Sequence, residues 1–302
     1  MRSAAVYVVV LLALAGCGTC GGQGCGGRIS SADLYFTRYA ATPNLMKVRF
    51  DYSGGKFTLD KPKSVATLNG VDGLVFAPDG DLLVGGQGGT VHKVRVADGK
   101  FKDVKANTVA YHVSMDPSGK KAWVAGIPGP LAEIPLSPFG DGIPHQLQGD
   151  DVAVTSIAFD SSGHAYYTSS GSGGYGSVGN IDLKNFTTTR RMENIPAAHG
   201  MVFDRFTGDL LLFGSNHITQ VDPKNMKVIS DLEMKASVTL DQGTVDGNGY
   251  AFVASNSGEL VFVDYSGSKK ISSGGNTVVV KFLASSLDDV APLSGAGSAP
   301  CA

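Results

Sequence analysis

This sequence has few charged residues and no extended run of one sign. Charged side chains make up 17% of the 302 residues, and 25 Lys and Arg against 27 Asp and Glu give a formal net charge of −2. Proteins that bind nucleic acid neutralise backbone phosphates with clustered basic side chains. The composition therefore excludes nucleic acid as an expected partner.

Cysteine is also scarce, and it is confined to the two ends of the chain. Three cysteines lie near the start and one, Cys301, near the end. A structural zinc site needs four converging ligands, and no further candidate ligands lie near Cys20 and Cys25. We therefore expect no cysteine-based zinc site in this protein.

A hydrophobic run long enough to span a membrane is missing too. The apolar run from Ala4 to Ala15 follows Met1-Arg2 and has the length of a secretory h-region, which is too short for a membrane-spanning helix. It ends in Leu14-Ala15-Gly16-Cys17, which resembles the lipobox where bacterial lipoproteins are cleaved and acylated.

We predict a lipoprotein signal peptide over 1–16, a lipid on Cys17 and a Gly-rich tether over 17–31. The lipid would anchor the protein to the bilayer of a bacterial cell envelope, exposed to the periplasm or the cell surface. An ordinary signal peptide with a nearby cysteine is the alternative.

Glycine is plentiful, and a repeated unit runs through the chain. Gly accounts for 41 residues, which favours short strands joined by tight turns. Residues 72–85 read as an apolar strand, a Pro-Asp-Gly turn and a second apolar strand. Four looser copies begin at Tyr111, Thr155, His199 and Asp241. A spacing of roughly 40–45 residues with several strands per unit is typical of propeller blades.

The two ends of the repeat region complement each other. Residues 32–68 contain strands without an inner strand, and residues 288–293 resemble a lone inner strand. Joining them predicts an all-β, six-bladed β-propeller over 32–295, closed by N- and C-terminal strands that share one blade and followed by a tail over 296–302. A ring that stayed unclosed would leave exposed strand edges. Five blades with extra segments at the ends is the alternative.

This closure bears on the cysteines, because it brings the two chain ends together. An exported protein meets an oxidising compartment, where disulfides persist. We predict that Cys301 pairs with Cys25 or Cys20, with Cys25 favoured because it lies nearer the first strand. A local bridge between Cys20 and Cys25 is the alternative.

The repeats resemble those of the NHL, SMP-30/gluconolactonase and streptogramin-lyase-like propellers. Gly-Leu-Val-Phe-Ala-Pro-Asp-Gly at 73–80 and its looser copies carry this resemblance. Neither the Trp-Phe-Thr-Glu type of motif of the lyases nor the early Glu-Gly-Pro of the lactonases is present. The resemblance therefore implies the fold and carries no catalytic residue. One Asp of each unit is expected to form the turn between its first two strands; these are Asp79, Asp116, Asp160, Asp204 and Asp246.

A site is expected where the first residues of the inner strands meet around the channel. This ring consists of Asp72, Tyr111, Thr155, His199, Asp241 and Asp288. His112 and Gln242 lie one step along, and His217 lies in a loop expected on the same face. Carboxylates facing one axis could hold calcium or magnesium, although polar side chains also line any water-filled channel.

Two functions follow from this ring. The first is a monomeric binding or scaffold module at the envelope that recognises a protein or a glycan. The second is a metal-dependent lactonase or lyase, with His199 as general base and Asp72, Asp241 and Asp288 as cation ligands; Tyr111, His112, Thr155, Gln242 and His217 would then contact the ligand. We favour the first, because the catalytic motifs of the related families are missing.

Overall fold

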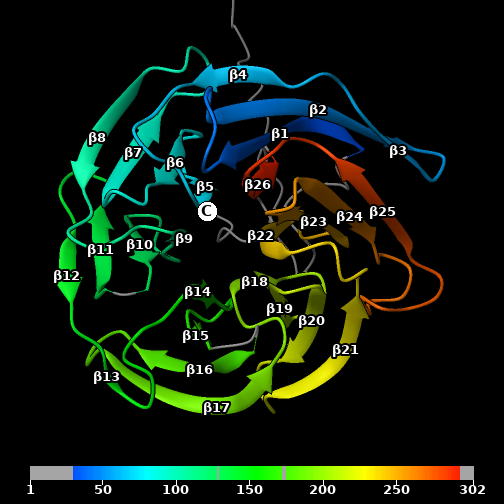
Figure 1. Ribbon diagram of the computed structural model, residues 1–302. Helices are drawn as coiled ribbons and strands as arrows, with labels where there is room; N and C mark the ends of the chain where they lie inside the picture. Colours follow the sequence, from blue (N-terminus) through cyan, green and yellow to red (C-terminus); the bar gives the residue numbers. More distant parts are fainter. Residues whose placement is uncertain (1–29, 128, 172–174, 293–302) are drawn as a thin grey trace, which may run out of the picture.

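The computed structural model of this protein describes residues 30–127, 129–171 and 175–292. These residues form strands and no helix, so this part contains no helix that could span a membrane. Six sheets of four or five strands surround a central axis as the blades of a propeller (Figure 1). The predicted all-β, six-bladed propeller is confirmed. The expected signal peptide, the C-terminal tail and the predicted roles of Cys17, Cys25 and Cys301 concern residues outside the described part.

The closing blade is assembled from both ends of the chain. Its strands are β26 (Leu287–Pro292), β1 (Ser31–Arg38), β2 (Leu45–Ser53), β3 (Lys56–Leu59) and β4 (Lys63–Ala66). The innermost strand β26 pairs antiparallel with β1, so that Phe36 lies opposite Val290. This is the predicted closure. The strand β1 begins at Ser31, so the last residue assigned to the tether belongs to the propeller.

The next two blades follow in chain order from the inside outward. One contains β5 (Leu74–Phe76), β6 (Leu82–Gly85), β7 (Thr90–Val94) and β8 (Phe101–Lys105). The other contains β9 (His112–Met115), β10 (Lys121–Ala125), β11 (Leu131–Pro135) and β12 (Ile143–His145). Each is a four-stranded antiparallel sheet whose inner strand begins beside the first residue of a sequence repeat.

Three further blades complete the ring. The first contains β14 (Ser156–Phe159), β15 (Ala165–Ser170), β16 (Gly176–Asp182) and β17 (Thr187–Ile195), and the short strand β13 (Gln148–Gly149) joins β17 in parallel. The second contains β18 (Gly200–Asp204), β19 (Asp209–Gly214), β20 (His217–Asp222) and β21 (Lys227–Glu233). The third contains β22 (Leu240–Val245), β23 (Tyr250–Ser255), β24 (Glu259–Asp264) and β25 (Thr277–Phe282).

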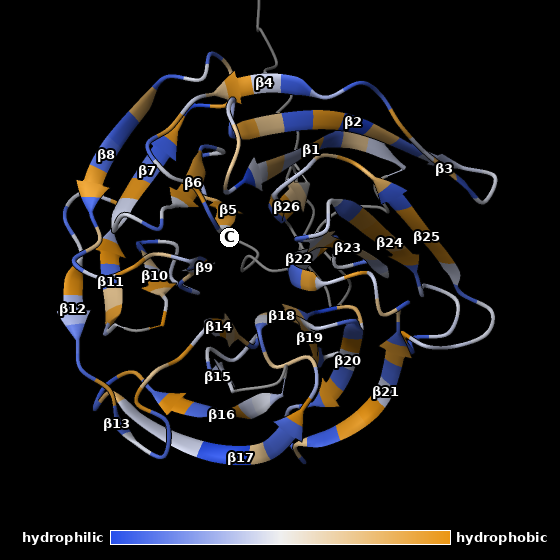
Figure 2. Ribbon diagram, viewed as in Figure 1, coloured by the Kyte–Doolittle hydropathy of each residue, from blue (hydrophilic) through white to orange (hydrophobic). Residues whose placement is uncertain are grey.

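Burial decreases from the inner strands to the outer ones. All four residues of β6 are buried, whereas most residues of β8 are exposed. The hydropathy follows the same gradient, since β5 and β6 are hydrophobic and β17 carries long hydrophilic stretches (Figure 2). The core lies between adjacent blades. At the closing blade, for example, Phe57 stacks on Phe262 with ring centroids 4.4 Å apart. Burying both faces of the middle strands holds the blades together.

The predicted turn aspartates are confirmed by their hydrogen bonds. Asp116 Oδ1 accepts a hydrogen bond from Ser118 N at 2.9 Å, and Asp160 Oδ1 accepts one from Ser162 N at 2.8 Å. The other three accept equivalent bonds two residues along the chain, and they are Asp79, Asp204 and Asp246. These carboxylates satisfy backbone donors in the turn between the first two strands, so their role is structural.

Candidate functional site

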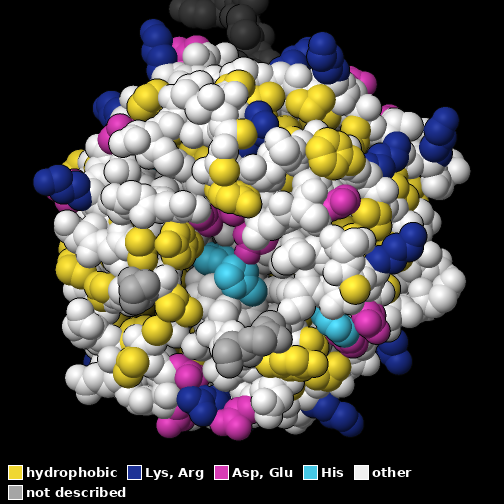
Figure 3. Space-filling view, in the orientation of Figure 1, with side chains coloured by type: hydrophobic (Ala, Val, Ile, Leu, Met, Phe, Trp, Pro, Cys, Tyr) yellow, Lys and Arg dark blue, Asp and Glu magenta, His cyan; other side chains and the backbone are white. Residues whose placement is uncertain are grey.

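The inner strands of all six blades begin around the same mouth of the central channel. Histidine and carboxylate side chains gather there, at the centre of the face shown in Figure 3. Glycine lets the strands approach one another at this point. A Cβ on Gly73 would lie 2.5 Å from Tyr111 O, and one on Gly200 would lie 2.5 Å from Asp241 O. Any larger side chain at either position would push neighbouring blades apart.

Three side chains at the mouth, His112, His199 and Asp241, come within ligand distance of one another. Each of them offers one candidate ligand atom, and these atoms all lie within 4.8 Å of one another. His199 Nε2 lies 2.5 Å from Asp241 Oδ1, and the His112 and His199 rings meet edge to face at 5.1 Å between centroids. His112 and Asp241 are buried, whereas the side chain of His199 is 39% exposed. The group therefore opens to solvent through His199.

Two more carboxyl groups lie behind Asp241. The buried Asp288 carboxyl is hydrogen-bonded to those of Asp72 and Asp241. Asp288 Oδ2 is buried and receives no hydrogen bond from a donor among the described residues. Within the same described part, no Lys or Arg forms an ion pair with any of the three. Like charges in contact at low dielectric repel strongly unless a proton or a cation lies between them.

The protonation states follow from this arrangement. Burial raises the pKa of Asp72 to about 7 and, with repulsion from Asp241 and Asp72, raises the pKa of Asp288 well above its usual range. Burial opposes ionisation of Asp241, but the hydrogen bond from His199 holds its pKa below the ordinary value. Asp241 is thus the ionised carboxylate at the mouth, and Asp288 is a neutral acid that shares its proton with its neighbours.

The two imidazoles differ in charge for equally local reasons. Burial, followed by repulsion from His199, lowers the pKa of His112 to about 3, so this ring is neutral. Burial also acts against a charge on His199, but the hydrogen bond to Asp241 outweighs it and raises the pKa of His199. The exposed imidazole therefore carries the positive charge that balances Asp241.

Ser170, at the end of β15, supports His199 from the other side. Ser170 Oγ lies 2.8 Å from His199 Nδ1, accepts a hydrogen bond from Thr155 Oγ1 at 3.0 Å and donates one to Ala198 O at 3.2 Å. Its hydroxyl proton is directed at Ala198, so Nδ1 of His199 is the donor in their contact. This fixes the ring with Nε2 toward Asp241. The repeat pattern in the sequence does not single out Ser170, because this contact joins neighbouring blades.

A hollow of about 260 Å³ opens beside this group between the blades of β15 and β22. His199 and Asp241 form part of its wall. The remaining lining includes an exposed aromatic ring and polar groups, among them Tyr175, Ser170, Ser215 and Asn256. The described lining contains no Lys or Arg. Chemically, the hollow can hold a small uncharged ligand with its polar end against His199.

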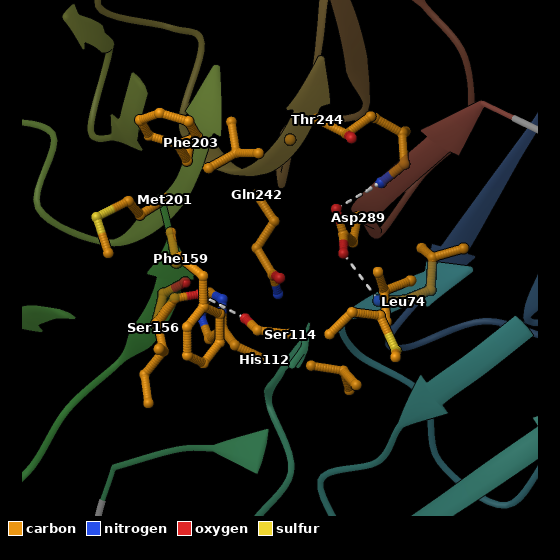
Figure 4. A pocket seen from close by; sticks show the side chains of 18 residues that line it. Leu74, His112, Ser114, Ser156, Phe159, Met201, Phe203, Gln242, Thr244 and Asp289 are labelled. Atoms are coloured by element: carbon orange, nitrogen blue, oxygen red, sulfur yellow. Dashed lines mark hydrogen bonds between the residues drawn. The ribbon is translucent and has the colours of Figure 1, made fainter. Parts of the chain in front are cut away.

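Below the mouth the channel narrows to a cavity of about 60 Å³ (Figure 4). Gln242 extends into this cavity, and its Nε2 donates to Tyr111 O at 3.2 Å and to Asp72 Oδ1 at 3.4 Å. Deeper in the channel the wall is apolar, with Phe159 and Phe203. Hydroxyl groups also line this cavity, from Ser114, Ser156 and Thr244, so the histidine–carboxylate group at the mouth continues into a mixed polar and apolar channel.

The structure brings most of the predicted site residues together and separates one. Asp72, His112, His199, Asp241, Gln242 and Asp288 meet at the mouth. Thr155 supports Ser170, and Tyr111 contributes its backbone oxygen. His217 does not join them, because its Nδ1 lies 2.8 Å from Asp231 Oδ2 on the outer strand β21. Strand pairing directs that imidazole away from the axis.

Comparisons with known proteins identify the fold alone. No family model matches the chain, and no curated protein matches its sequence. Among solved structures, it is similar to a candidate 6-phosphogluconolactonase from Bacteroides fragilis, with 11% identity and a TM-score of 0.53 over 85% of this chain and 83% of that one. It is also similar to the β-propeller domain of Swd1 from Myceliophteria thermophila, with 15% identity and a TM-score of 0.52 over 84% and 86%. At such low identity, these likenesses show a β-propeller.

Proposed function

We propose that this protein is an exported, lipid-anchored propeller that binds a neutral sugar unit of an envelope glycan in the hollow beside His199. The lipobox-like sequence ending at Cys17 supports the anchored location. The observation that carries the ligand class is the described lining of the hollow, which combines an exposed aromatic ring with polar groups and contains neither Lys nor Arg. Ligand sites of this kind use an apolar platform for affinity and a few polar groups for orientation.

The charges in the hollow argue against an anionic ligand. Phosphate and carboxylate groups are recognised by Arg, by Lys or by helix N-termini. The described lining has none of these, and its one cationic group, His199, is already paired with the Asp241 carboxylate. The name of the Bacteroides fragilis neighbour indicates a phosphorylated sugar substrate. We infer that this chain takes a ligand without a phosphate.

The remaining groups fit a sugar ring. Tyr175 is 54% exposed, so its ring can cover the apolar face of a pyranose. Asn256 lines the hollow, and its buried Oδ1 has no donor among the described residues, so rotation of this side chain toward the hollow would let it accept a hydrogen bond from a hydroxyl group. Ser170 and Asp241 offer further acceptors along the same wall.

The binding experiment compares neutral and phosphorylated sugars on chelator-treated protein. Calorimetric titration with glucose, N-acetylglucosamine and their oligomers is expected to show binding, and glucose 6-phosphate is expected to bind at least tenfold more weakly. Tyr175→Ala should weaken neutral-sugar binding by about tenfold, which corresponds to about 1.4 kcal/mol. Tyr39→Ala is the matched control, because Tyr39 is 40% exposed and lies outside the hollow. Equal affinities for both sugar classes, or an unaffected Tyr175 variant, would contradict the proposal.

A second candidate, a metal-dependent lactonase or lyase, is favoured by the contact between His199 and Asp241. A partly exposed imidazole that is held by a buried carboxylate can serve as a general acid or base. This function requires a cation at the mouth in addition to the bound ligand. It therefore depends on the ion proposed in the next section, whereas sugar binding does not.

A further inference from the structure

We propose that the channel mouth binds a divalent transition metal ion of the zinc class, with His112, His199 and Asp241 as its protein ligands. This goes beyond sugar binding and is tested without any sugar. The candidate ligand atoms come from three different blades and converge within 4.8 Å. Zinc bonds of 2.0–2.1 Å would set the ligand atoms of a tetrahedral site roughly 3.3 Å apart.

The three buried carboxyl groups at the mouth favour a cation in place of the protons that they otherwise share. Asp72, Asp241 and Asp288 are all buried, and Asp288 is hydrogen-bonded to the other two. Among the described residues, only His199 pairs with this group as a cation, through Asp241. Asp288 Oδ2 is buried without a donor although its neighbours are polar. A divalent ion beside Asp241 would compensate the carboxylates, which the fold otherwise holds together at a cost in free energy.

Hydrogen bonds already orient both imidazoles for an ion. Metal-binding histidines usually hydrogen-bond through one ring nitrogen while the other binds the metal. His199 Nδ1 lies 2.8 Å from Ser170 Oγ, which leaves Nε2 facing Asp241. His112 is hydrogen-bonded to Gln242. Ser170 and Gln242 are thus positioning residues for the two histidines.

The donor set selects the class of ion. Calcium and magnesium, which the ring of carboxylates in the sequence could hold, prefer sets of oxygen ligands. Two imidazole nitrogens with one carboxylate oxygen are typical of zinc and neighbouring transition metals. Three protein ligands would leave one position of a tetrahedral ion open. Two of the three, His199 and Asp241, also line the hollow, so an ion held there would lie beside the proposed ligand site.

The test uses the full chain, freed of metal by a chelator and dialysed. Calorimetric titration with Zn²⁺ is expected to give one saturable site, and Co²⁺ is expected to give the visible absorption of a tetrahedral complex. Asp241→Asn and His199→Gln should weaken Zn²⁺ binding at least a hundredfold. Ser170→Ala should weaken it about tenfold, as is usual for residues that orient a ligand. His217→Gln is the matched control, because its His–Asp pair lies on outer strands.

Several outcomes would overturn the proposal. These are the absence of saturable Zn²⁺ binding, unchanged binding in both Asp241→Asn and His199→Gln, or displacement of Zn²⁺ by equimolar Ca²⁺ or Mg²⁺. Circular dichroism of each variant establishes that it is folded, and Ser170→Ala provides a test in which every ligand is retained. Sugar binding is measured on chelator-treated protein and metal binding without sugar, so either proposal can fail alone.

Discussion

At the scale of single residues, neighbouring buried carboxyl groups are stabilised in different ways. Asp289 Oδ2 accepts a hydrogen bond from Leu74 N at 2.8 Å, and its Oδ1 accepts one from Val290 N at 2.7 Å. This carboxyl therefore joins the closing blade to the next one. Asp241 is paired with His199, and Asp288 Oδ2 has no donor among the described residues. Asp289 therefore has a structural role, whereas the carboxyl groups of Asp241 and Asp288 keep acceptor atoms that a bound ligand or ion can use.

A histidine outside the site gives the protein a predictable response to acid. His145 stacks on Phe186 with ring centroids 3.9 Å apart, and its buried Nε2 has no partner among the described residues. Burial lowers the pKa of His145 below its ordinary value of 6.5, with Glu133 raising it and Lys121 lowering it by smaller amounts. Its contribution to stability is therefore full above the unfolded-state pKa and is lost as the pH falls through the folded-state pKa.

His145→Phe keeps an aromatic ring on Phe186 and removes this titration. We expect the unfolding free energy of the wild type to fall more than that of the variant between pH 7.5 and pH 5. Urea denaturation at both pH values measures the difference. Identical losses in the two proteins would show that protonation of His145 does not oppose folding.

The sequence could identify the mouth residues but not all of their contacts. Aligning the repeats placed Asp72, His199 and Asp241 at equivalent positions, and equivalent positions in a ring face the same axis. The contact between Ser170 and His199 depends on how two blades are rotated against each other, which no repeat pattern records. His217 was expected in a loop at the mouth, but it is the first residue of β20, and its imidazole pairs with Asp231 on the outer strand β21.

At the scale of strands, position within a blade decides how much an apolar side chain contributes. Phe252 on β23 is fully buried and packs against Phe50 and Phe262. Phe282, at the end of the outer strand β25, is 68% exposed. The hydrophobic free energy depends on the area removed from water. A Phe side chain therefore contributes more to the free energy of unfolding on β23 than at the end of β25.

Phe252→Ala and Phe282→Ala form a matched pair that tests this gradient. The first should lower the unfolding free energy by about 3–5 kcal/mol, because it leaves a cavity between two blades. The second should lower it by less than about 1 kcal/mol, as is usual for surface substitutions. Urea denaturation of both variants gives the comparison. Similar losses would mean that the outer strand is covered in solution, for example by a partner.

Strand boundaries followed from the sequence wherever a turn motif marked them. The Asp-containing turns placed the first hairpin of each repeat, and the turn hydrogen bonds of Asp116 and Asp160 bear this out. The short strand β13 was not foreseen, because its parallel pairing with β17 depends on the packing of one blade against the next. Local turn chemistry is encoded in a few residues, whereas contacts between blades depend on the whole ring.

At the scale of the whole molecule, closure depends on one pair of strands. The strands β26 and β1 are joined only by hydrogen bonds and side-chain packing, with Leu34 opposite Pro292. Propellers contain many contacts between residues that are distant in sequence. The pairing of β26 with β1 is the one that joins the two ends of the chain. The closure could be predicted from the sequence, because residues 32–68 lack an inner strand and residues 288–293 resemble a lone inner strand. A covalent link near this seam would restrict the unfolded chain across almost its full length.

The predicted disulfide between Cys25 and Cys301 would supply that link. Both cysteines lie outside the described residues. However, β1, the first strand after Cys25, pairs with β26, the last strand before Cys301, and Leu34 lies opposite Pro292 in this pair. In the chain-entropy model, closing a loop of this length stabilises the fold by about 5 kcal/mol, and strain lowers the gain. Peptide mapping without reductant should recover Cys25 joined to Cys301, and reduction should lower the melting temperature. Recovery of a Cys20–Cys25 peptide with a free thiol at Cys301 would show that strand pairing alone closes the ring.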